Sequence, residues 1–328
     1  MDTSHSMQSI GLVTKNVLHN FLLLPYRKLM KPPHRKMWQT LEKKNIISGP
    51  WRLYAAKHSI KVRIGAFRSM QLYKSKGLFL NVHIDTYSDC NRNCKFCFNY
   101  DKLPKRKSGV MSSAVYRRII DELSEIHYCG KISPYYYGEP LLDKRLPGMI
   151  SYARQKCQFA YIQANSNGDY LTEELLLQLI KAGLDKIFVT NYEKVGLPKA
   201  TSNDKLIEQN KRLMYLAEKY PQFVQLRRWT EISFENRTGL VIRRPNRRID
   251  EVCLRPSYMA VIDWQGNVLL CCVDYHSQYV MGNVMEDSIR RIWFSQRFCT
   301  ERLLLQKTGS RRKIDICVRC DADGSLFI

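Results

Sequence analysis

From residue 78 onward the chain alternates between two hydrophobic periods. Apolar side chains alternate with strand period in residues 78–85. Further strands are predicted in residues 131–137, 159–164, 186–190 and 222–226. Apolar side chains recur three to four positions apart, the pattern of helices, in residues 112–126, 172–183 and 204–220. Strands separated by helices of this length are typical of parallel βα units, so we expect an α/β fold built as a sheet or barrel.

The regular pattern stops near Cys253, where short strands, turns and cysteines follow one another. We therefore place a boundary between about Arg228 and Glu251. The expected organisation is a basic N-terminal extension at 1–77, a barrel core at 78–235 and a small cysteine-rich α+β domain at 236–328.

The N-terminal end differs from the rest of the chain in its excess of basic residues. Among the 328 residues, 53 Lys and Arg stand against 30 Asp and Glu, a formal net charge of +23. Residues 1–77 contain fifteen of these basic residues and two acidic ones. Residues 17–31 join an apolar patch to a basic one, which is compatible with an interfacial helix on an anionic membrane or with a surface arm on the catalytic domain.

Composition narrows the class of protein. No apolar run approaches the roughly 20 residues of a membrane-spanning helix, and a secretory signal pattern is missing. We expect a cytoplasmic protein, peripheral to the inner face of the membrane if residues 1–77 bind lipid. The excess of positive charge keeps an RNA-modifying or RNA-binding protein as an alternative of a different class, but nucleic acid is disfavoured as a partner because aromatic RNA-recognition motifs are missing.

A first group of cysteines follows the first predicted strand. Cys90, Cys94 and Cys97 lie within eight residues, and the total of 11 cysteines in an apparently cytosolic chain favours metal or redox chemistry over disulfides. Three thiolates at this spacing can bind one side of an iron–sulfur cubane. Structural zinc needs four protein ligands, and a fourth is missing nearby, so we favour an iron–sulfur cluster with one open iron.

A second group of cysteines lies in the C-terminal region. Its members are Cys253, Cys271, Cys317 and Cys320, and Gly266 suits a turn ahead of Cys271. Four thiolates can hold zinc or an iron–sulfur cluster, and spacing alone does not separate the two. The adjacent Cys272 is an alternative ligand to Cys271. The remaining cysteines are interpreted as small buried apolar side chains: Cys129, Cys157 and Cys299.

The first cysteine group resembles the radical S-adenosylmethionine (SAM) enzymes, whose signature is Cys-x3-Cys-x2-Cys after the first strand of a partial (β/α) barrel. The resemblance implies that a [4Fe–4S] cluster on these cysteines binds SAM and that reductive cleavage of SAM yields a 5′-deoxyadenosyl radical. Further positions match the family at successive strand ends, and the resemblance assigns them to the SAM site: Phe96, Gly138, Glu139, Ser166, Asn167, Thr190 and Asn191. Glu139 would receive the methionine ammonium.

The region from Cys253 is similar to a shortened SPASM domain with one cluster, called a twitch domain. Beside a radical SAM cluster, this likeness favours an auxiliary [4Fe–4S] cluster over zinc. Residues 78–320 are also similar to the 2-deoxy-scyllo-inosamine dehydrogenases, through segments such as 130–142 and 167–173.

This resemblance implies a radical dehydrogenase that oxidises a secondary alcohol of a sugar- or cyclitol-like metabolite, with the auxiliary cluster accepting an electron. Arg237 is the candidate contact of the substrate hydroxyl, against the alternative of a surface charge, and Tyr137 is a candidate wall of the same pocket. The implied reductant is a flavodoxin- or ferredoxin-type protein. A radical epimerase with a thiol hydrogen donor, and a maturase of ribosomal peptides, remain alternatives.

Overall fold

The computed structural model describes residues 68–69, 71, 73, 77–192, 203–228, 235–236, 238–241 and 248–324. The proposed membrane segment, most of the basic extension and Arg237 lie outside these described residues.

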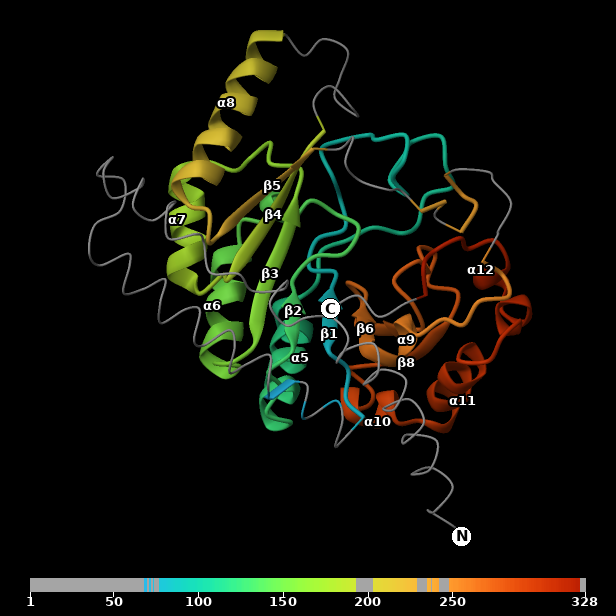
Figure 1. Cartoon of the computed structure of the whole chain (residues 1–328). Helices are drawn as coiled ribbons and strands as arrows, with labels where there is room; N and C mark the ends of the chain where they lie inside the picture. Colours follow the sequence, from blue (N-terminus) through green and yellow to red (C-terminus); the bar gives the residue numbers. More distant parts are fainter. Residues whose placement is uncertain are drawn as a thin grey trace.

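One eight-stranded sheet runs through the described part of the chain, in the order β5-β4-β3-β2-β1-β6-β7-β8 (Figure 1). The first five strands are parallel, and β6 also pairs in parallel with β1. The last three strands form an antiparallel extension. The strand bounds are β1 Asn81–Ile84, β2 Lys131–Ser133, β3 Tyr161–Ser166, β4 Lys186–Asn191, β5 Val224–Arg228, β6 Met259–Ile262, β7 Asn267–Leu269 and β8 Val280–Asn283.

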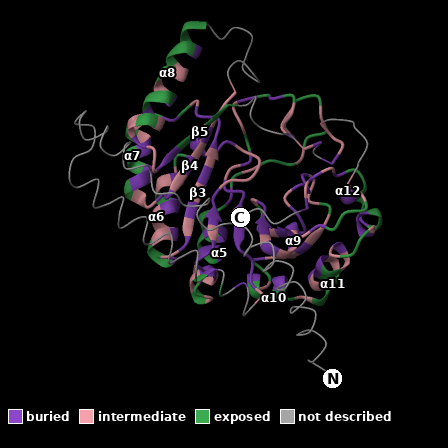
Figure 2. Ribbon diagram, in the orientation of Figure 1, coloured by how far each residue is buried: buried purple, intermediate pink, exposed green. Residues whose placement is uncertain are grey.

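Four helices cover one face of the parallel strands (Figure 1). They are α5 Ser113–Glu125, α6 Leu146–Lys156, α7 Glu173–Ala182 and α8 Asn203–Lys219, with the short 3-10 helix η1 at Pro140–Leu142. The strands present to these helices side chains that are fully buried, such as Val82, Ile132 and Ile187. This apolar layer is the main core, shown in purple in Figure 2. The alternate positions of each strand face the other way, and we call that surface the inner face.

Short helices complete the C-terminal region, shown in orange and red in Figure 1. They are α9 Arg255–Tyr258, α10 Ile289–Trp293, α11 Gln296–Leu305, η3 Ser310–Lys313 and α12 Asp315–Val318. Trp293 and Phe298 are buried against one another with ring centres 5.0 Å apart. Among the described residues, no helix combines the length and the hydropathy that crossing a bilayer requires.

The expected α/β fold with an incomplete barrel is confirmed, and three helix ends agree closely with the sequence. The hydroxyls of Ser112 and Thr172 cap α5 and α7, and Gly183 ends α7 at a positive φ of 109°. The predicted second strand is too long: β2 stops at Ser133 because Pro134 cannot donate a backbone hydrogen bond. Tyr137 therefore lies in the loop after β2, whereas Ser166 is the last residue of β3 and not part of the turn.

Candidate active site

The carboxyl ends of the parallel strands meet at one edge of the sheet, and the first cysteine group lies in the loop that leaves β1 at that edge. The Cys97 N–H donates to the Cys94 carbonyl at 2.9 Å, which closes a tight turn. Other N–H groups are directed at sulfur: Arg92 N lies 3.5 Å from Cys90 Sγ, and Asn99 N lies 3.5 Å from Cys97 Sγ. N–H groups around the cysteine sulfurs are a feature of iron–sulfur ligation.

The thiols of this loop need a positive partner in order to ionise. Burial raises the pKa of the Cys90 thiol to about 11 and that of Cys94 to about 12. Within the described residues, no three His, Cys, Asp or Glu side chains converge as ligands of a single ion. A cubane makes no such demand, because its protein ligands are spread over separate irons. Three thiols, with N–H groups directed at two of the sulfurs, are a donor set that fits an iron–sulfur cluster.

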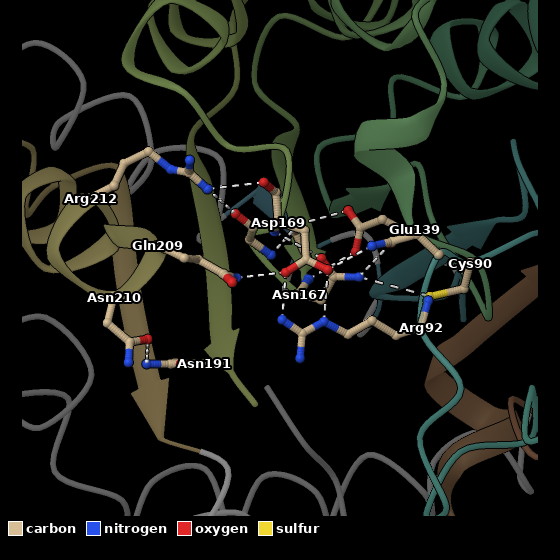
Figure 3. Close-up of polar contacts among 12 residues, drawn as sticks. Cys90, Arg92, Glu139, Asn167, Asp169, Asn191, Gln209, Asn210 and Arg212 are labelled. Carbon is tan, nitrogen blue, oxygen red and sulfur yellow. Dashed lines mark hydrogen bonds and ion pairs between the residues drawn. The ribbon is translucent and has the colours of Figure 1, made fainter. Parts of the chain in front are cut away.

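An ion pair that sequence reasoning missed holds this loop against the turn after β3 (Figure 3). Arg92 Nε and Nη2 donate to the two carboxylate oxygens of Asp169 at 2.8 and 2.5 Å. The Arg92 side chain is 1% exposed, so the pair is shielded from water. From α8, Gln209 Nε2 donates to Asp169 Oδ1 at 2.6 Å, and Arg212 Nη2 donates to the Asp169 carbonyl at 2.9 Å. An arginine inside the cysteine motif was the only signal in the sequence for this contact.

Glu139 lies beside the cysteine loop and is 3% exposed. Its carboxylate accepts hydrogen bonds from Ser166 Oγ at 2.7 Å and from the Asn167 N–H at 2.8 Å. Asn167 Nδ2 in turn lies 3.8 Å from Cys90 Sγ. Burial raises the pKa of Glu139 to about 7, because these hydrogen bonds do not fully replace water. The structure thus joins three predicted SAM-site residues in one network.

Gly138 has a backbone role in the same segment. A Cβ at this position would lie 1.9 Å from the Tyr87 carbonyl oxygen, so any other residue would displace the cysteine loop. The neighbouring Glu139 N–H donates to the Asp89 carbonyl at 2.9 Å. Gly138 therefore allows the loop after β2 to lie directly against the loop after β1.

The last two residues of β4 are placed differently from one another. Asn191 Nδ2 donates to Asn210 Oδ1 on α8 at 2.6 Å, whereas Thr190 lies on the inner face and pairs in register with Arg227. Phe96 packs against Tyr192 just beyond this strand end, with ring centres 5.3 Å apart. The strand end and the cysteine motif therefore meet in space.

Aromatic side chains connect the two cysteine regions. Phe98 stacks on Tyr275 with ring centres 4.8 Å apart, and Tyr137 packs edge-on against both rings. The Tyr137 hydroxyl donates to the Cys272 carbonyl at 2.7 Å. The Arg106 guanidinium lies 5.0 Å from the centre of the Tyr137 ring and forms a buried ion pair with Asp85. Sequence reasoning found Tyr137 but neither Tyr275 nor Arg106.

The second cysteine group is gathered by the C-terminal helices. Cys253 N–H donates to the Leu305 carbonyl at 2.7 Å, and the Cys320 N–H closes a turn on the Cys317 carbonyl at 3.1 Å. Burial raises the pKa of the Cys317 thiol, and the nearby thiols of Cys253 and Cys320 raise it further. The buried Arg311 ties the flanking chain together through the Val252 and Ala322 carbonyls. These thiols are therefore neighbours in space.

Cys271 and Cys272 both lie near this group. Cys271 belongs to the buried core together with Cys253, Cys317 and Cys320, whereas Cys272 is only partly buried. Arg255 Nη1 lies 3.8 Å from Cys272 Sγ, and Arg255 is itself paired with Glu235.

The remaining cysteines lie away from the strand ends that carry the site. Cys129 and Cys157 are buried and line a pocket of about 500 Å³ at the opposite edge of the sheet. Cys299 on α11 is only partly buried, which corrects the prediction of a small buried apolar side chain, and it accepts a hydrogen bond from Arg302 at 3.2 Å.

Comparisons with known proteins agree with this geometry. Residues 84–190 match the radical SAM superfamily, and residues 253–321 match the SPASM iron–sulfur cluster-binding domain. The SAM-dependent 2-deoxy-scyllo-inosamine dehydrogenase of Niallia circulans is 32% identical over 247 residues, which cover 74% of this chain and 93% of that protein.

The chain belongs to the radical SAM superfamily. It is an enzyme of that superfamily that uses SAM and two [4Fe–4S] clusters. A crystal structure of BtrN with AdoMet and 2-DOIA has 31% identity and a TM-score of 0.65, and the match covers 75% of this chain and 94% of that one. BtrN in an open conformation has 29% identity and a TM-score of 0.58, with 75% and 93% covered.

Proposed function

We propose that this radical SAM enzyme oxidises a secondary alcohol of a small sugar- or cyclitol-like metabolite to a ketone. The name of the Niallia circulans relative supports a dehydrogenase, since the match covers 93% of that protein. The presence of a second cysteine group supports oxidation, because the reaction needs an acceptor for one electron besides the radical.

Glu139 is the observation that carries the SAM assignment. Its buried carboxyl forms no ion pair with a cation among the described residues, yet it lies one side chain away from Cys90. A buried carboxylate is stabilised by a charged partner, and the ammonium group of SAM is such a partner.

We assign the ligands by the same reasoning. Cys90, Cys94 and Cys97 would hold the cluster that binds SAM, and Cys253, Cys271, Cys317 and Cys320 would hold the auxiliary cluster. Phe96, Gly138, Ser166, Asn167, Thr190 and Asn191 would surround SAM. We also keep the division into 1–77, 78–235 and 236–328; the two family matches, at 84–190 and 253–321, are compatible with it.

When bound, the two cofactor groups supply a carbon-centred radical for hydrogen abstraction and an acceptor for the electron left on the substrate. The chain's own residues would position the alcohol between them. Tyr137 supports this role, because it packs against the ring that follows Cys97 and bonds to the Cys272 carbonyl. Arg237 stays our proposed contact of the substrate hydroxyl; as a permanent cation it would act by charge and hydrogen bonding.

Two of the spare thiols are badly placed to donate hydrogen in an epimerisation. A hydrogen donor would have to reach the substrate, whereas Cys129 and Cys157 line the pocket at the far edge of the sheet. A flavodoxin- or ferredoxin-type protein is the proposed electron donor, since cleavage of SAM consumes an electron.

Anaerobic reconstitution tests the proposal. We expect about eight irons per chain, falling to about four in a Cys90/Cys94/Cys97→Ala variant, since each cubane holds four. Cyclitols and sugars with secondary alcohols should then stimulate formation of 5′-deoxyadenosine, with one ketone formed per SAM cleaved. About four irons in the wild type, falling to none in the variant, with zinc at the second site would contradict the electron-acceptor role.

A further inference from the structure

The inner face of the parallel strands is polar and basic. His83 on β1 and Lys131 on β2 alternate with buried residues that face the helices, and the exposed Arg227 on β5 lies on the same face as His83 and Lys131. The strand register places these positions on one face of the sheet, because His83 pairs with Ser133, which follows Lys131 by two positions.

Ring contacts fix the direction of two of these side chains. The Arg227 guanidinium lies over the Phe188 ring of β4, with its central carbon 4.2 Å from the ring centre. The His83 ring packs edge-on against Tyr135 at 5.6 Å. Arg227 therefore extends across the inner face from the last parallel strand toward the middle of the sheet.

The cations on this face are close enough to repel one another. Burial lowers the pKa of Lys131, and Arg227 lowers it further. Burial likewise lowers the pKa of His83 to about 3, with Lys131 as the next cause. In both cases burial is the larger cause of the lowered pKa, and the repulsion by the neighbouring cation adds to it.

No described carboxylate compensates these cations. Neither Lys131 nor Arg227 forms an ion pair within the part of the chain that the structure describes. Asp85 leaves β1 at one edge of the sheet and is paired with Arg106, while Asp185 precedes β4 at the other edge and is paired with Arg154. The carboxylates of Asp85 and Asp185 are thus already bound to other arginines.

We propose that the alcohol substrate carries an anionic group, a phosphate ester or a carboxylate, which Arg227 and Lys131 bind on the inner face. This inference rests on the proposed function and specifies its substrate class. A phosphate or carboxylate accepts two hydrogen bonds from the planar guanidinium and one from the ammonium. The amino group of an inosamine is a cation at neutral pH and meets repulsion on this face.

The positions of Lys131 and Arg227 along their strands can be compared with the position of the SAM site. Lys131 opens β2 at the amino edge, whereas Glu139 and Thr190 lie beyond or at the carboxyl ends, where SAM would bind. Arg227, by contrast, pairs in register with Thr190 near the carboxyl end of β5. An anion held between Lys131 and Arg227 therefore lies next to the SAM site, and the rest of the substrate extends toward the cysteine loop.

Binding of three matched cyclitols to the reconstituted, SAM-loaded protein tests this inference. The probes are myo-inositol 1-phosphate, myo-inositol and 2-deoxy-scyllo-inosamine, with inorganic phosphate as a charge-only probe. We expect the phosphate ester to bind at least about tenfold more tightly than inositol, and the amine most weakly. Arg227→Gln should abolish the preference, and Lys131→Met should weaken it.

Arg228→Gln is the matched control, since it removes the same charge from the next position of β5, which faces the other side of the sheet. It should leave the preference intact, and iron content with circular dichroism confirms that each variant is folded. Arg227→Glu should reverse the order and favour the amine. Tightest binding of the amine by the wild type, an unchanged preference in Arg227→Gln, or no binding of phosphate or its ester would each overturn the inference.

Product analysis separates this inference from the proposed function. A ketone formed from the neutral or amino cyclitol and not from the phosphate ester refutes the anionic substrate and leaves alcohol oxidation standing. Binding of the ester without alcohol-dependent 5′-deoxyadenosine or ketone refutes alcohol oxidation, while the order of affinities still decides which charge the inner face selects.

Discussion

Arg92 and Asp169 form a two-point ion pair that joins the cysteine loop to the turn after β3. Removing one partner of a buried pair costs about 3 kcal/mol, because the other charge remains without compensation. We therefore expect Asp169→Asn to lower the free energy of unfolding and to make the first cluster labile. Iron release to a chelator, followed under anaerobic conditions, measures the second effect.

Asp185→Asn is the control for this prediction. Asp185 forms an equally short pair with Arg154 at the opposite edge of the sheet. Its variant should lose stability and keep a normal rate of iron release. Equal release from both variants would mean that the Arg92–Asp169 pair serves only the fold.

Binding of SAM should depend on the ionisation of Glu139. The pKa of this carboxyl is raised to about 7 by burial, so in the free protein it is increasingly protonated as the pH falls below that value. A protonated carboxyl loses its attraction for the ammonium of SAM, so affinity should decrease between about pH 8 and about pH 6. Equilibrium dialysis of the reconstituted protein measures this dependence.

Glu139→Gln should weaken SAM binding about tenfold or more and remove most of the pH dependence. Glu174→Gln, on the exposed first turn of α7, is the comparison variant and should behave as the wild type. A pH dependence that survives in Glu139→Gln would assign it to another group.

The auxiliary cluster should use Cys271 in preference to Cys272. Cys271 shares the buried core with the other three cysteines, while Cys272 is partly buried and contacts Arg255. Iron per chain should fall from about eight to about four in Cys271→Ala and stay near eight in Cys272→Ala. The reverse pattern would exchange the two assignments.

The free energy of unfolding should decrease as the pH is lowered, because of His83. Its pKa in the folded protein is lowered to about 3, with burial as the main cause, whereas an unfolded chain binds the proton near pH 6.5. Below about pH 6.5 the unfolded state gains a proton that the folded state does not, so stability decreases by up to about 1.4 kcal/mol per pH unit.

Anaerobic urea unfolding of wild type and His83→Gln at about pH 7.5 and about pH 5.5 measures this loss. The variant should show a smaller decrease between the two conditions, since Gln does not titrate. An identical decrease in both proteins would place the pH dependence elsewhere.

The sequence predicted the parts of the site that depend on local spacing. The cysteine motifs, the cap at Ser112 and the end of α7 at Gly183 each follow from residues a few positions apart. It also placed Glu139 near the first cluster through the family likeness. Helix α6 was missed although Leu146, Met149, Ile150 and Ala153 have helical spacing, because Pro147 and Gly148 suggest a turn in isolation.

Contacts between distant segments were beyond the reach of the pattern. Arg92 and Asp169 are separated by 77 positions, and Tyr137 meets the Cys272 carbonyl across 135. An arginine or an aspartate in a sequence does not indicate a buried partner, since both residue types most often lie on solvated surfaces. The basic inner face could not be predicted either, because its cations come from strands that are far apart in sequence and meet only when those strands are in register.

The parallel pairing of β6 with β1 has a consequence for how the protein can be divided. β1 has β2 on one side and β6 on the other, so it is a central strand only while the C-terminal region is present. Cutting the chain between the two family matches would turn β1 into an edge strand with unpaired N–H and C=O groups, a surface prone to aggregation. The two cysteine regions are thus halves of one hydrogen-bonded ladder, and neither is a removable module.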